Sequence, residues 1–264
     1  MARLRIDALL ADRGLFPSRE QARAAVLAGE VRVGGQVVRK AGQSVDEDAI
    51  IEVTERPRYV SRGGDKLAGA LAKFAVPIAG RSAIDVGAST GGFTDCLLQE
   101  GAAHVVALDV GYGQLAWSLR VDDRVTVIER TNVRSVSPEE LGAPFDLLVC
   151  DVSFISLRTV MPHLEALLGA EGDMVALVKP QFEAGKGRVG KRGVVKDAAV
   201  HEDVLRRAID SVHDAGLVVR ALTFSPITGP NGNIEFWLWA ARSGEETDVD
   251  PVALVSQAHE AFGG

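Results

Sequence analysis

The sequence has few cysteines and no long apolar run. Only Cys96 and Cys150 occur among 264 residues, and their positions match no metal-binding or redox spacing. No stretch reaches the roughly 20 apolar residues that a membrane helix needs, and the first residues lack the apolar core of a signal peptide. These features argue against disulfide-rich, secreted and helical membrane proteins. We therefore expect a cytoplasmic protein with no metal ion.

The net charge of −7 gives no direct indication of nucleic-acid binding, but the basic residues are unevenly placed. Residues 1–45 contain eight basic and four acidic side chains, and residues 179–196 contain six basic and one acidic. Two basic regions in an acidic chain indicate a localised surface for a polyanion. The length allows one large domain, or a small domain joined to a medium one.

The most informative stretch is a turn of small residues between an apolar run and a helical pattern. It reads IDVGASTGGFT over residues 84–94, and it predicts a strand over 82–86 and a helix from about Gly92. A second apolar run ends at Asp109, where an acidic residue typically hydrogen-bonds a ribose diol. The nicotinamide fingerprint fits poorly, because Ser89 replaces its second glycine and Asp85 would repel a pyrophosphate.

The pattern D-x-G-x-x-x-G, with an acid closing the next strand, resembles the S-adenosylmethionine site of Rossmann-like methyltransferases. This resemblance implies S-adenosyl-L-methionine as the cofactor, since that ligand carries no phosphate and tolerates a carboxylate near the turn. The cofactor-binding residues that it implies are Asp85, Gly87, Ser89, Thr90, Gly91, Gly92, Phe93, Asp109 and Asn132. Asn132 is equally well interpreted as a plain turn residue, and glycines that only shape a loop remain an alternative for the whole stretch.

Residues 1–55 predict a small α+β domain of two short helices and a hairpin. The hairpin turns at Gly34-Gly35, a pair suited to tight primed turns. The patterns L-R-I-D-x-L-L and S-R-x-x-A-x-x-x-V-x-x-G-x-V-x-V-x-G-x-x-V resemble the ribosomal-protein S4-type RNA-binding domain. The RNA-binding residues that this resemblance implies are Arg5, Arg19, Arg23 and Lys40. The alternative is a solvated basic face on a structural module.

Strands and helices alternate through the rest of the chain. Pro57 predicts a linker over residues 56–62, followed by a methyltransferase domain over 63–241 and an acidic tail with a helix over 242–264. The alternation predicts an α/β fold, a Rossmann-like domain with a seven-stranded, largely parallel sheet. Its expected strands are 82–86, 105–109, 125–128, 145–150, 174–178, 217–224 and 234–240, with helices over 157–168 and 197–215 and a mobile loop over 184–196.

Four charged residues lie at the ends of predicted strands or just before the first one. Such a charge is costly to desolvate unless it is paired, and the reacting groups of open α/β sheets gather at the carboxyl ends of strands. Lys66, Asp151, Lys179 and Glu235 match the tetrad of FtsJ-like ribose 2′-O-methyltransferases. The assembled chain resembles the TlyA family over residues 1–241. This resemblance implies methylation of the 2′-hydroxyl of cytidine in ribosomal RNA of the small subunit, the large subunit or both.

The tetrad suggests a division of roles. A partly buried lysine near a second cation can accept a proton, so we assign the general base to Lys179, with Lys66 beside it and the two carboxylates orienting both. Phe154 and Phe182 are candidates for stacking on a flipped base, and a place in the apolar core is the alternative for each. We expect the basic segment to contact RNA through Lys186, Arg188, Lys191 and Arg192. A loop over 229–233 is a candidate gate.

Other functions remain open at this stage. An RNA-binding ribosome-assembly factor with a vestigial catalytic domain is one, although the tetrad and the glycine turn are intact. A haemolysin-like protein is another, but no amphipathic lytic helix supports it. Base and protein methyltransferases usually place an aromatic-rich or N-P-P-[YF] motif where this chain has D-V-S-F. We expect ribosomal RNA or ribosomal subunits as partners, no membrane, and a monomer, with an oligomer left open.

Overall fold

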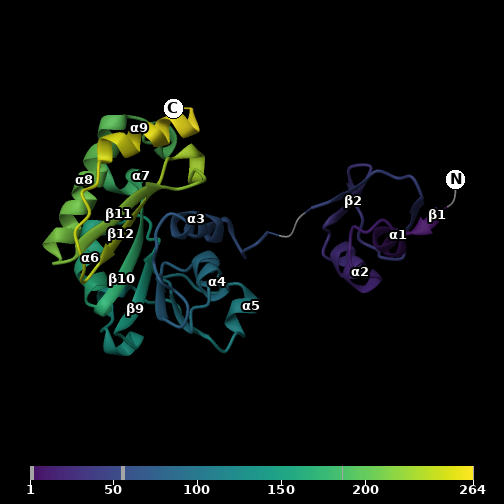
Figure 1. Cartoon of the computed structure of the whole chain (residues 1–264), viewed down its shortest axis with the longest axis horizontal. Helices are drawn as coiled ribbons and strands as arrows, with labels where there is room; N and C mark the ends of the chain where they lie inside the picture. The colour runs from purple at the N-terminus through teal and green to yellow at the C-terminus, as the bar shows by residue number, and fades with distance from the viewer. Residues whose placement is uncertain (1–2, 55–56, 186, 264) are drawn as a thin grey trace. The chain divides into compact units, whose positions relative to one another are not determined.

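The computed structural model describes residues 3–54, 57–185 and 187–263. The chain divides into two compact units, one ending at Pro57 and the other starting at Arg58 (Figure 1). Part of the expected linker over 56–62, Arg56, lies outside the described residues. Helix α3 (Arg62–Leu71) starts at the last residue of that range, where the Ser61 hydroxyl accepts a hydrogen bond from Gly63 N.

The first unit contains two helices and two small sheets. The helices are α1 (Ile6–Asp12) and α2 (Arg19–Leu27), and the Ser18 hydroxyl caps α2 by accepting a hydrogen bond from Gln21 N at 3.2 Å. The strands are β1 (Arg3–Arg5), β2 (Val31–Val33), β3 (Gln36–Val37), β4 (Ser44–Asp46) and β5 (Ile51–Val53). Strand β2 lies between β3 and β5, and β1 pairs with β4. The expected helix pair and hairpin are present, whereas the β1–β4 pair is an addition to the prediction.

The second unit is built on a seven-stranded sheet in the order β11-β12-β10-β9-β6-β7-β8. Its strands are β6 (Ser82–Val86), β7 (His104–Leu108), β8 (Val125–Ile128), β9 (Phe145–Cys150), β10 (Leu168–Val178), β11 (Val218–Phe224) and β12 (Phe236–Ala241). Strands β8, β7, β6, β9 and β10 are parallel, and β12 runs antiparallel to both of its neighbours. The predicted α/β architecture with a largely parallel sheet is confirmed.

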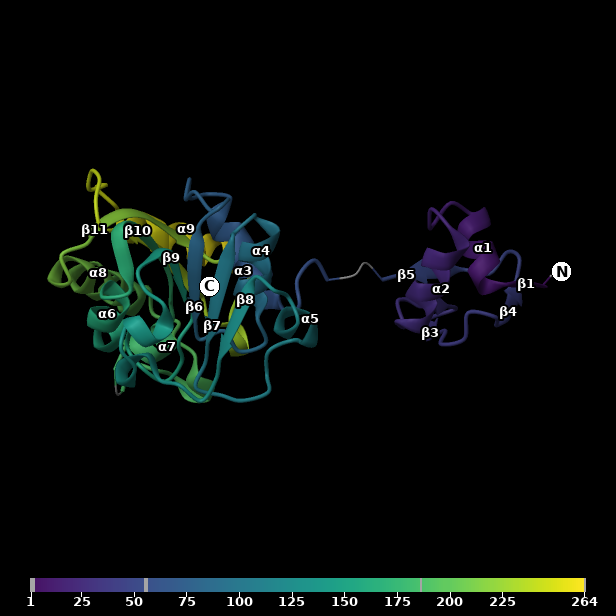
Figure 2. The ribbon, with the colours of Figure 1, turned by 90° about the horizontal axis from the view of Figure 1, so that it is seen from below.

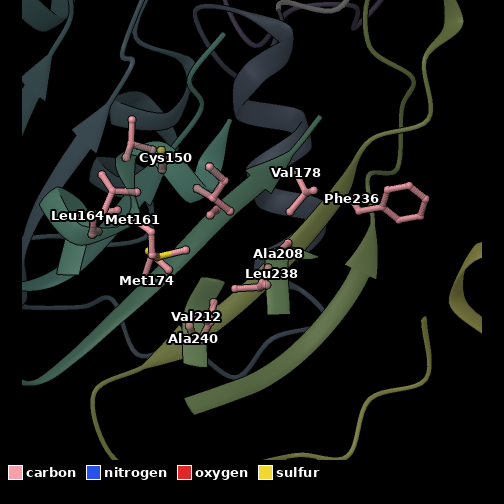
Figure 3. Close-up of a cluster of buried hydrophobic side chains, with 14 of the residues drawn as sticks. Cys150, Met161, Leu164, Met174, Val178, Ala208, Val212, Phe236, Leu238 and Ala240 are labelled. Atoms are coloured by element: carbon pink, nitrogen blue, oxygen red, sulfur yellow. The ribbon is translucent and has the colours of Figure 1, made fainter. Parts of the chain in front are cut away.

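Helices cover both faces of this sheet, with α6 and α8 on one side and α3 and α4 on the other (Figures 1 and 2). The helices that follow α3 are α4 (Gly92–Gln99), α5 (Trp117–Arg120), α6 (Leu157–Glu165), α7 (Pro180–Glu183), α8 (Ala198–Asp214) and α9 (Pro251–Phe262), and short 3₁₀ turns include η1 (Val133–Ser135) and η3 (Lys191–Gly193). The apolar cluster beneath α6 and α8 includes Met161, Val212 and Phe236 (Figure 3). Helix α9 adds Val255 and Ala258 to this cluster. A second apolar cluster, on the face covered by α3 and α4, includes Leu67, Leu97 and Trp237. The two clusters fix the strands whose carboxyl ends carry the loops described below.

The predicted boundary between α6 and β10 is wrong. The helix expected over 157–168 ends at Glu165, and Leu168 already belongs to β10. The apolar side chains of Leu164, Leu167 and Leu168 continue a helical spacing, which explains the longer prediction. Backbone pairing overrides that spacing, because Phe145 N donates to Leu167 O at 2.9 Å and Leu168 pairs with Phe145 in the sheet.

Candidate active site

The loops that leave the carboxyl ends of β6, β9 and β10 surround a cavity of about 620 Å³. This volume is within the usual range for a small-molecule site. Its lining includes Ser61, Arg62, Gly63, Lys66, Gly87, Ser89, Thr90, Gly92, Phe93, Asp151, Ser153, Phe154, Lys179, Gln181, Phe182, Asn231, Asn233 and Glu235. All four members of the predicted tetrad and five of the predicted cofactor residues therefore face one cavity.

The glycine turn after β6 lets two backbone segments approach closely. Gly87 has φ +91°, and a Cβ atom there would collide with the main-chain oxygen of Asp151. Gly92 begins α4, and a Cβ atom there would collide with the Ser61 hydroxyl and lie 2.8 Å from Gly64 N. The first turns of α3 and α4 therefore meet at the cavity, and side chains at these glycines would force them apart.

Asp85 lies under this turn and does not line the cavity. The carboxyl is fully buried, and Oδ2 accepts hydrogen bonds from Thr94 N at 2.9 Å and Thr94 Oγ1 at 2.7 Å. Burial raises the pKa of Asp85 to about 7, opposed by the hydrogen bond from the Thr94 side chain. Asp85 thus connects β6 to the first turn of α4.

Asp109 and Asn132 also lie outside the large cavity. Asp109 lines a smaller adjoining cavity, where Oδ2 accepts from Ser89 N at 2.8 Å and Oδ1 accepts from Gly111 N at 2.6 Å. Asn132 lines neither cavity, and its Oδ1 caps η1 by accepting from Arg134 N at 3.0 Å. The contacts of Asn132 within the described chain are those of a turn residue.

The tetrad forms two ion pairs at the large cavity. Lys66 on α3 places Nζ 2.5 Å from Oε2 of Glu235, and the two residues are 8% and 1% exposed. Lys179 follows β10, and its Nζ contacts Oδ1 of Asp151. Glu235 precedes β12, whereas the sequence predicted it as part of the strand. Each lysine is held by one carboxylate, which offsets the cost of removing its charge from water.

Two polar residues that the sequence prediction missed complete these pairs. Lys179 Nζ donates to Ser153 Oγ at 3.0 Å, and Gln181 Nε2 donates to Glu235 Oε1 at 3.3 Å. Ser153 lies two residues after Asp151, and Gln181 lies two residues after Lys179. Their proximity to predicted catalytic positions was the only available signal, and it does not reveal which way a side chain points.

An aromatic pair lies at the same cavity. The rings of Phe154 and Phe182 have centroids 4.9 Å apart, and the Phe154 side chain is 91% exposed. Phe154 also has φ +62°, a left-handed conformation that is strained for a bulky residue. Neither ring belongs to the buried apolar clusters, so the core interpretation of these residues is not supported.

Hydrogen bonds join the basic segment to the loop over 229–233. Asn233 Nδ2 donates to Gly193 O at 2.9 Å, and Val195 N donates to Asn233 Oδ1 at 3.0 Å. Asn231 Nδ2 donates to Arg192 O at 3.1 Å. Val195 is buried, so the segment expected to be a mobile loop is held next to the cavity by these hydrogen bonds.

The basic side chains of this segment differ in their surroundings. Arg188 forms an ion pair with Asp203 on α8. Lys191 and Arg192 are exposed and form no ion pair with the described residues. Lys186 lies outside the described residues. Lys191 and Arg192 are therefore more available to a polyanion than Arg188.

The predicted RNA-binding residues of the first unit form two groups. Asp7 is buried, and its carboxylate lies 2.8 Å from Nη2 of Arg5 and 3.3 Å from Nη2 of Arg19. The hydrogen bond from Arg5 lowers the pKa of Asp7 to about 2, with burial opposing it and Arg19 adding to it. Arg23 and Lys40 are exposed and form no ion pair within the described part of this unit.

The described residues lack two further features. They contain no group of three or more histidine, cysteine, aspartate or glutamate side chains that could hold a metal ion. None of their helices is both long enough and apolar enough to cross a membrane. The charged side chains that the structure places at the cavity include two lysine–carboxylate pairs beside a glycine turn.

Comparisons with known proteins agree with this arrangement. The FtsJ-like methyltransferase family matches residues 59–242, and the S4 domain family matches residues 4–51. The 16S/23S rRNA (cytidine-2′-O)-methyltransferase TlyA of Mycobacterium tuberculosis is 51% identical, over 98% of this chain and 97% of its own. Hemolysin A of Brachyspira hyodysenteriae is 40% identical, over 88% and 98%. The solved structure named "Putative hemolysin from Streptococcus thermophilus" has a TM-score of 0.76 and 42% identity, over 100% of this chain and 98% of its own.

Proposed function

Because the chain belongs to the TlyA group of FtsJ-like methyltransferases, which carry an S4 domain, we propose that it methylates the ribose 2′-hydroxyl of cytidine in ribosomal RNA. The observation that carries this proposal is the meeting of two lysine–carboxylate pairs at one cavity beside the glycine turn. The substrate is 16S RNA, 23S RNA or both, and it places the enzyme with ribosomes in the cytoplasm.

The cavity fits S-adenosylmethionine as the methyl donor. Gly87 and Gly92 line the cavity, and a Cβ atom at either position would collide with neighbouring protein atoms. The shape of the cavity beside the glycine turn therefore depends on these two glycines. Gly87, Ser89, Thr90 and Phe93 would hold the ligand in the large cavity, with Asp109 beside the smaller one. When bound, S-adenosylmethionine supplies an activated methyl group.

The tetrad prepares the ribose hydroxyl for transfer. In its neutral amine form Lys179 accepts the hydroxyl proton at Nζ, and Asp151 pairs with the ammonium group that results, while Ser153 fixes the direction of the side chain. Glu235 holds Lys66 and is itself held by Gln181, so the second pair fixes the opposite part of the lining. Orienting groups in this way contributes up to roughly 7–11 kcal/mol in well-aligned reactions.

Aromatic and basic side chains recognise the RNA. Phe154 and Phe182 present an exposed aromatic surface on which the base of the target nucleotide stacks after it leaves its helix. Arg23 and Lys40 of the first unit, with Lys191 and Arg192 of the basic segment, contact phosphates. An RNA-binding factor without activity would use the same cations, so RNA binding alone does not test the proposal.

The decisive change is at Lys179. We expect Lys179→Ala to lower the single-turnover methylation rate by about 10²–10⁴, the usual contribution of a positioned base, while RNA and S-adenosylmethionine still bind. Lys179→Arg should be equally slow, because a guanidinium group stays protonated. The measurement is single-turnover methylation of ribosomal RNA at saturating RNA and S-adenosylmethionine.

Lys73→Ala is the matched control, since this lysine contacts the Phe224 ring and does not line the cavity. Its rate should equal that of the wild type. Near-normal transfer by Lys179→Arg would refute the general-base assignment. Absence of any methylation by the wild-type protein would refute the proposed function itself.

A further inference from the structure

Helix α7 is a single turn that contacts several parts of the site. It follows Lys179 directly and spans Pro180–Glu183. Gln181 reaches Glu235, and Phe182 packs against Phe154. The side chain of its last residue, Glu183, contacts no member of the tetrad, and Glu183 does not line the cavity. The role of Glu183 is therefore not explained by the chemistry described above.

Glu183 joins α7 to the start of α6. Its Oε1 accepts a hydrogen bond from Leu157 N at 2.6 Å, and its Oε2 accepts one from Ser156 Oγ at 2.8 Å. Both donors lie at the N-terminus of α6, where a negative charge is favoured by the helix dipole. Burial raises the pKa of Glu183, and the two hydrogen bonds oppose this effect.

The same two chain segments, 151–157 and 179–183, carry the reactive contacts. Lys179 contacts Asp151 and Ser153 across them, and the Phe154 and Phe182 rings pack across them. Glu183 ties the far ends of these segments together. Its two bonds fix both the separation and the rotation of the segments, because they reach one backbone and one side-chain donor.

Resting on the proposed function, we propose that Glu183 is a positioning residue, which holds segments 151–157 and 179–183 in the register that places Lys179 against Asp151 and Ser153. The role depends on the reach of the side chain and on its two hydrogen bonds. A purely electrostatic role would depend on the charge instead. Two substitutions separate these possibilities.

Glu183→Gln keeps the length of the side chain and loses the charge. Its amide oxygen can accept from Leu157 N, and its amide nitrogen can donate to the Ser156 hydroxyl. Glu183→Asp keeps the charge but is one methylene too short to keep both bonds. We expect Glu183→Gln to retain most of the single-turnover rate, and Glu183→Asp to lose about 10²-fold, as small misplacements of catalytic groups do.

The effect should be confined to the chemical step. The Kd for S-adenosylmethionine and the KM for RNA should be unchanged in Glu183→Asp, while kcat falls. Asp250→Ala is the matched control, because Asp250 also caps a helix through two backbone bonds, to Val252 N at 2.9 Å and Ala253 N at 3.1 Å. It lies at the start of α9 and does not line the cavity, so its kcat should be that of the wild type.

A double-mutant cycle tests whether Glu183 acts through Lys179. The variant with both Glu183→Asp and Lys179→Ala should be no slower than Lys179→Ala alone, since residues that act as one unit are not additive. Additive losses would overturn the proposal. A normal rate in Glu183→Asp would overturn it too, as would equal losses in the Gln and Asp variants.

If Glu183→Asp does not fold, Ser156→Ala carries the test, because it removes one of the two bonds from the opposite segment. A fall in kcat with unchanged affinity for S-adenosylmethionine would then support the proposal, and a normal kcat would overturn it. The methylation activity of the wild-type protein shows whether a failure concerns this inference or the proposed function. If the wild type is active and Glu183→Asp is normal, only the positioning role fails.

Discussion

Asp85 illustrates how surroundings decide the role of a single carboxyl group. Its place in the D-x-G pattern predicted a cofactor contact, but the structure shows a buried group bonded to Thr94, with Oδ1 lacking a hydrogen-bond partner among the described residues. Its pKa is raised to about 7, mainly by burial. A carboxyl group in an unfolded chain titrates near pH 4. Between about pH 4 and pH 7, the native state therefore binds up to one more proton at this site than the unfolded state does.

The raised pKa of Asp85 predicts a specific dependence of stability on pH. Where the native state binds more protons, the free energy of unfolding falls as pH rises, here between about pH 4 and pH 7. Asp85→Asn keeps an acceptor for Thr94 and cannot ionise, so it should abolish this contribution. Urea unfolding of both proteins at pH 5 and pH 7.5 measures it. The wild type should lose more stability than the variant over this interval, and equal losses would contradict the prediction.

The comparison between the two proteins isolates Asp85 from other titrating groups. His201 on α8 is buried and bonded to His259 on α9 at 2.9 Å, and burial lowers its pKa to about 4. This effect has the opposite sign, since stability then falls as pH drops from about 6.5 towards 4. Both proteins contain the pair, so its contribution cancels in their difference.

At the scale of single elements, α2 presents two arginines with different surroundings. Arg19 shares the buried carboxylate of Asp7 with Arg5, whereas Arg23 lies one turn further along and forms no ion pair with the described residues. The sequence predicted that Arg19 and Arg23 contact phosphates in the same way. In the proposed function Arg23 contacts RNA alone, while Arg19 also stabilises the fold of its unit through Asp7.

This difference can be measured. Arg23→Ala should weaken RNA binding and reduce the slope of log K against log[salt] by roughly 0.7–0.9, the value for one phosphate contact, without changing stability. Arg19→Ala should also lower the free energy of unfolding, by about 1 kcal/mol or less because Arg5 still pairs with Asp7. Filter binding at several salt concentrations and thermal unfolding give both quantities. Identical behaviour of the two variants would contradict the assignment.

The elements were predictable wherever burial imposes a period on the sequence. Strands β6 and β9 are apolar runs bounded by turn residues, and their limits match the prediction. The end of α6 was not predictable, because Leu167 and Leu168 satisfy helix and strand patterns equally until the strand pairing is known. The hydrogen-bond and ion-pair partners of side chains could not be predicted either, because they depend on how distant segments pack. Nothing in the sequence places Glu183 at the start of α6 or Asp7 between two arginines.

At the scale of the whole chain, each unit has its own apolar core. The first packs around Ile6, Leu10 and Val26, and the second around the two clusters on either side of its sheet. The change at Pro57 was visible in the sequence, because a proline interrupts the apolar pattern there. Separate cores imply that each unit can fold without the other, although a domain of fewer than 60 residues is only marginally stable alone.

The independence of the cores allows the chain to be divided. A fragment spanning 58–264 should bind S-adenosylmethionine with the affinity of the whole chain, but should need about 10²–10⁴ times more RNA for the same methylation rate. Adding residues 1–57 as a separate fragment should not restore the rate. The measurement is the methylation rate against RNA concentration for the whole chain, the fragment and the mixture. A fragment with the RNA requirement of the whole chain would contradict the prediction.

The covalent connection between the units has a consequence for the choice of substrate. Once the first unit is anchored on RNA, the second no longer meets its nucleotide by free diffusion, but at a local concentration set by the length of the tether. Every nucleotide that the second unit can reach from the anchored first unit competes for the cavity. Nucleotides beyond that reach are not methylated, however well they would fit the cavity. Under the proposed function, the chain therefore selects its target in two stages, by distance from the anchored unit and by the chemistry of the cavity.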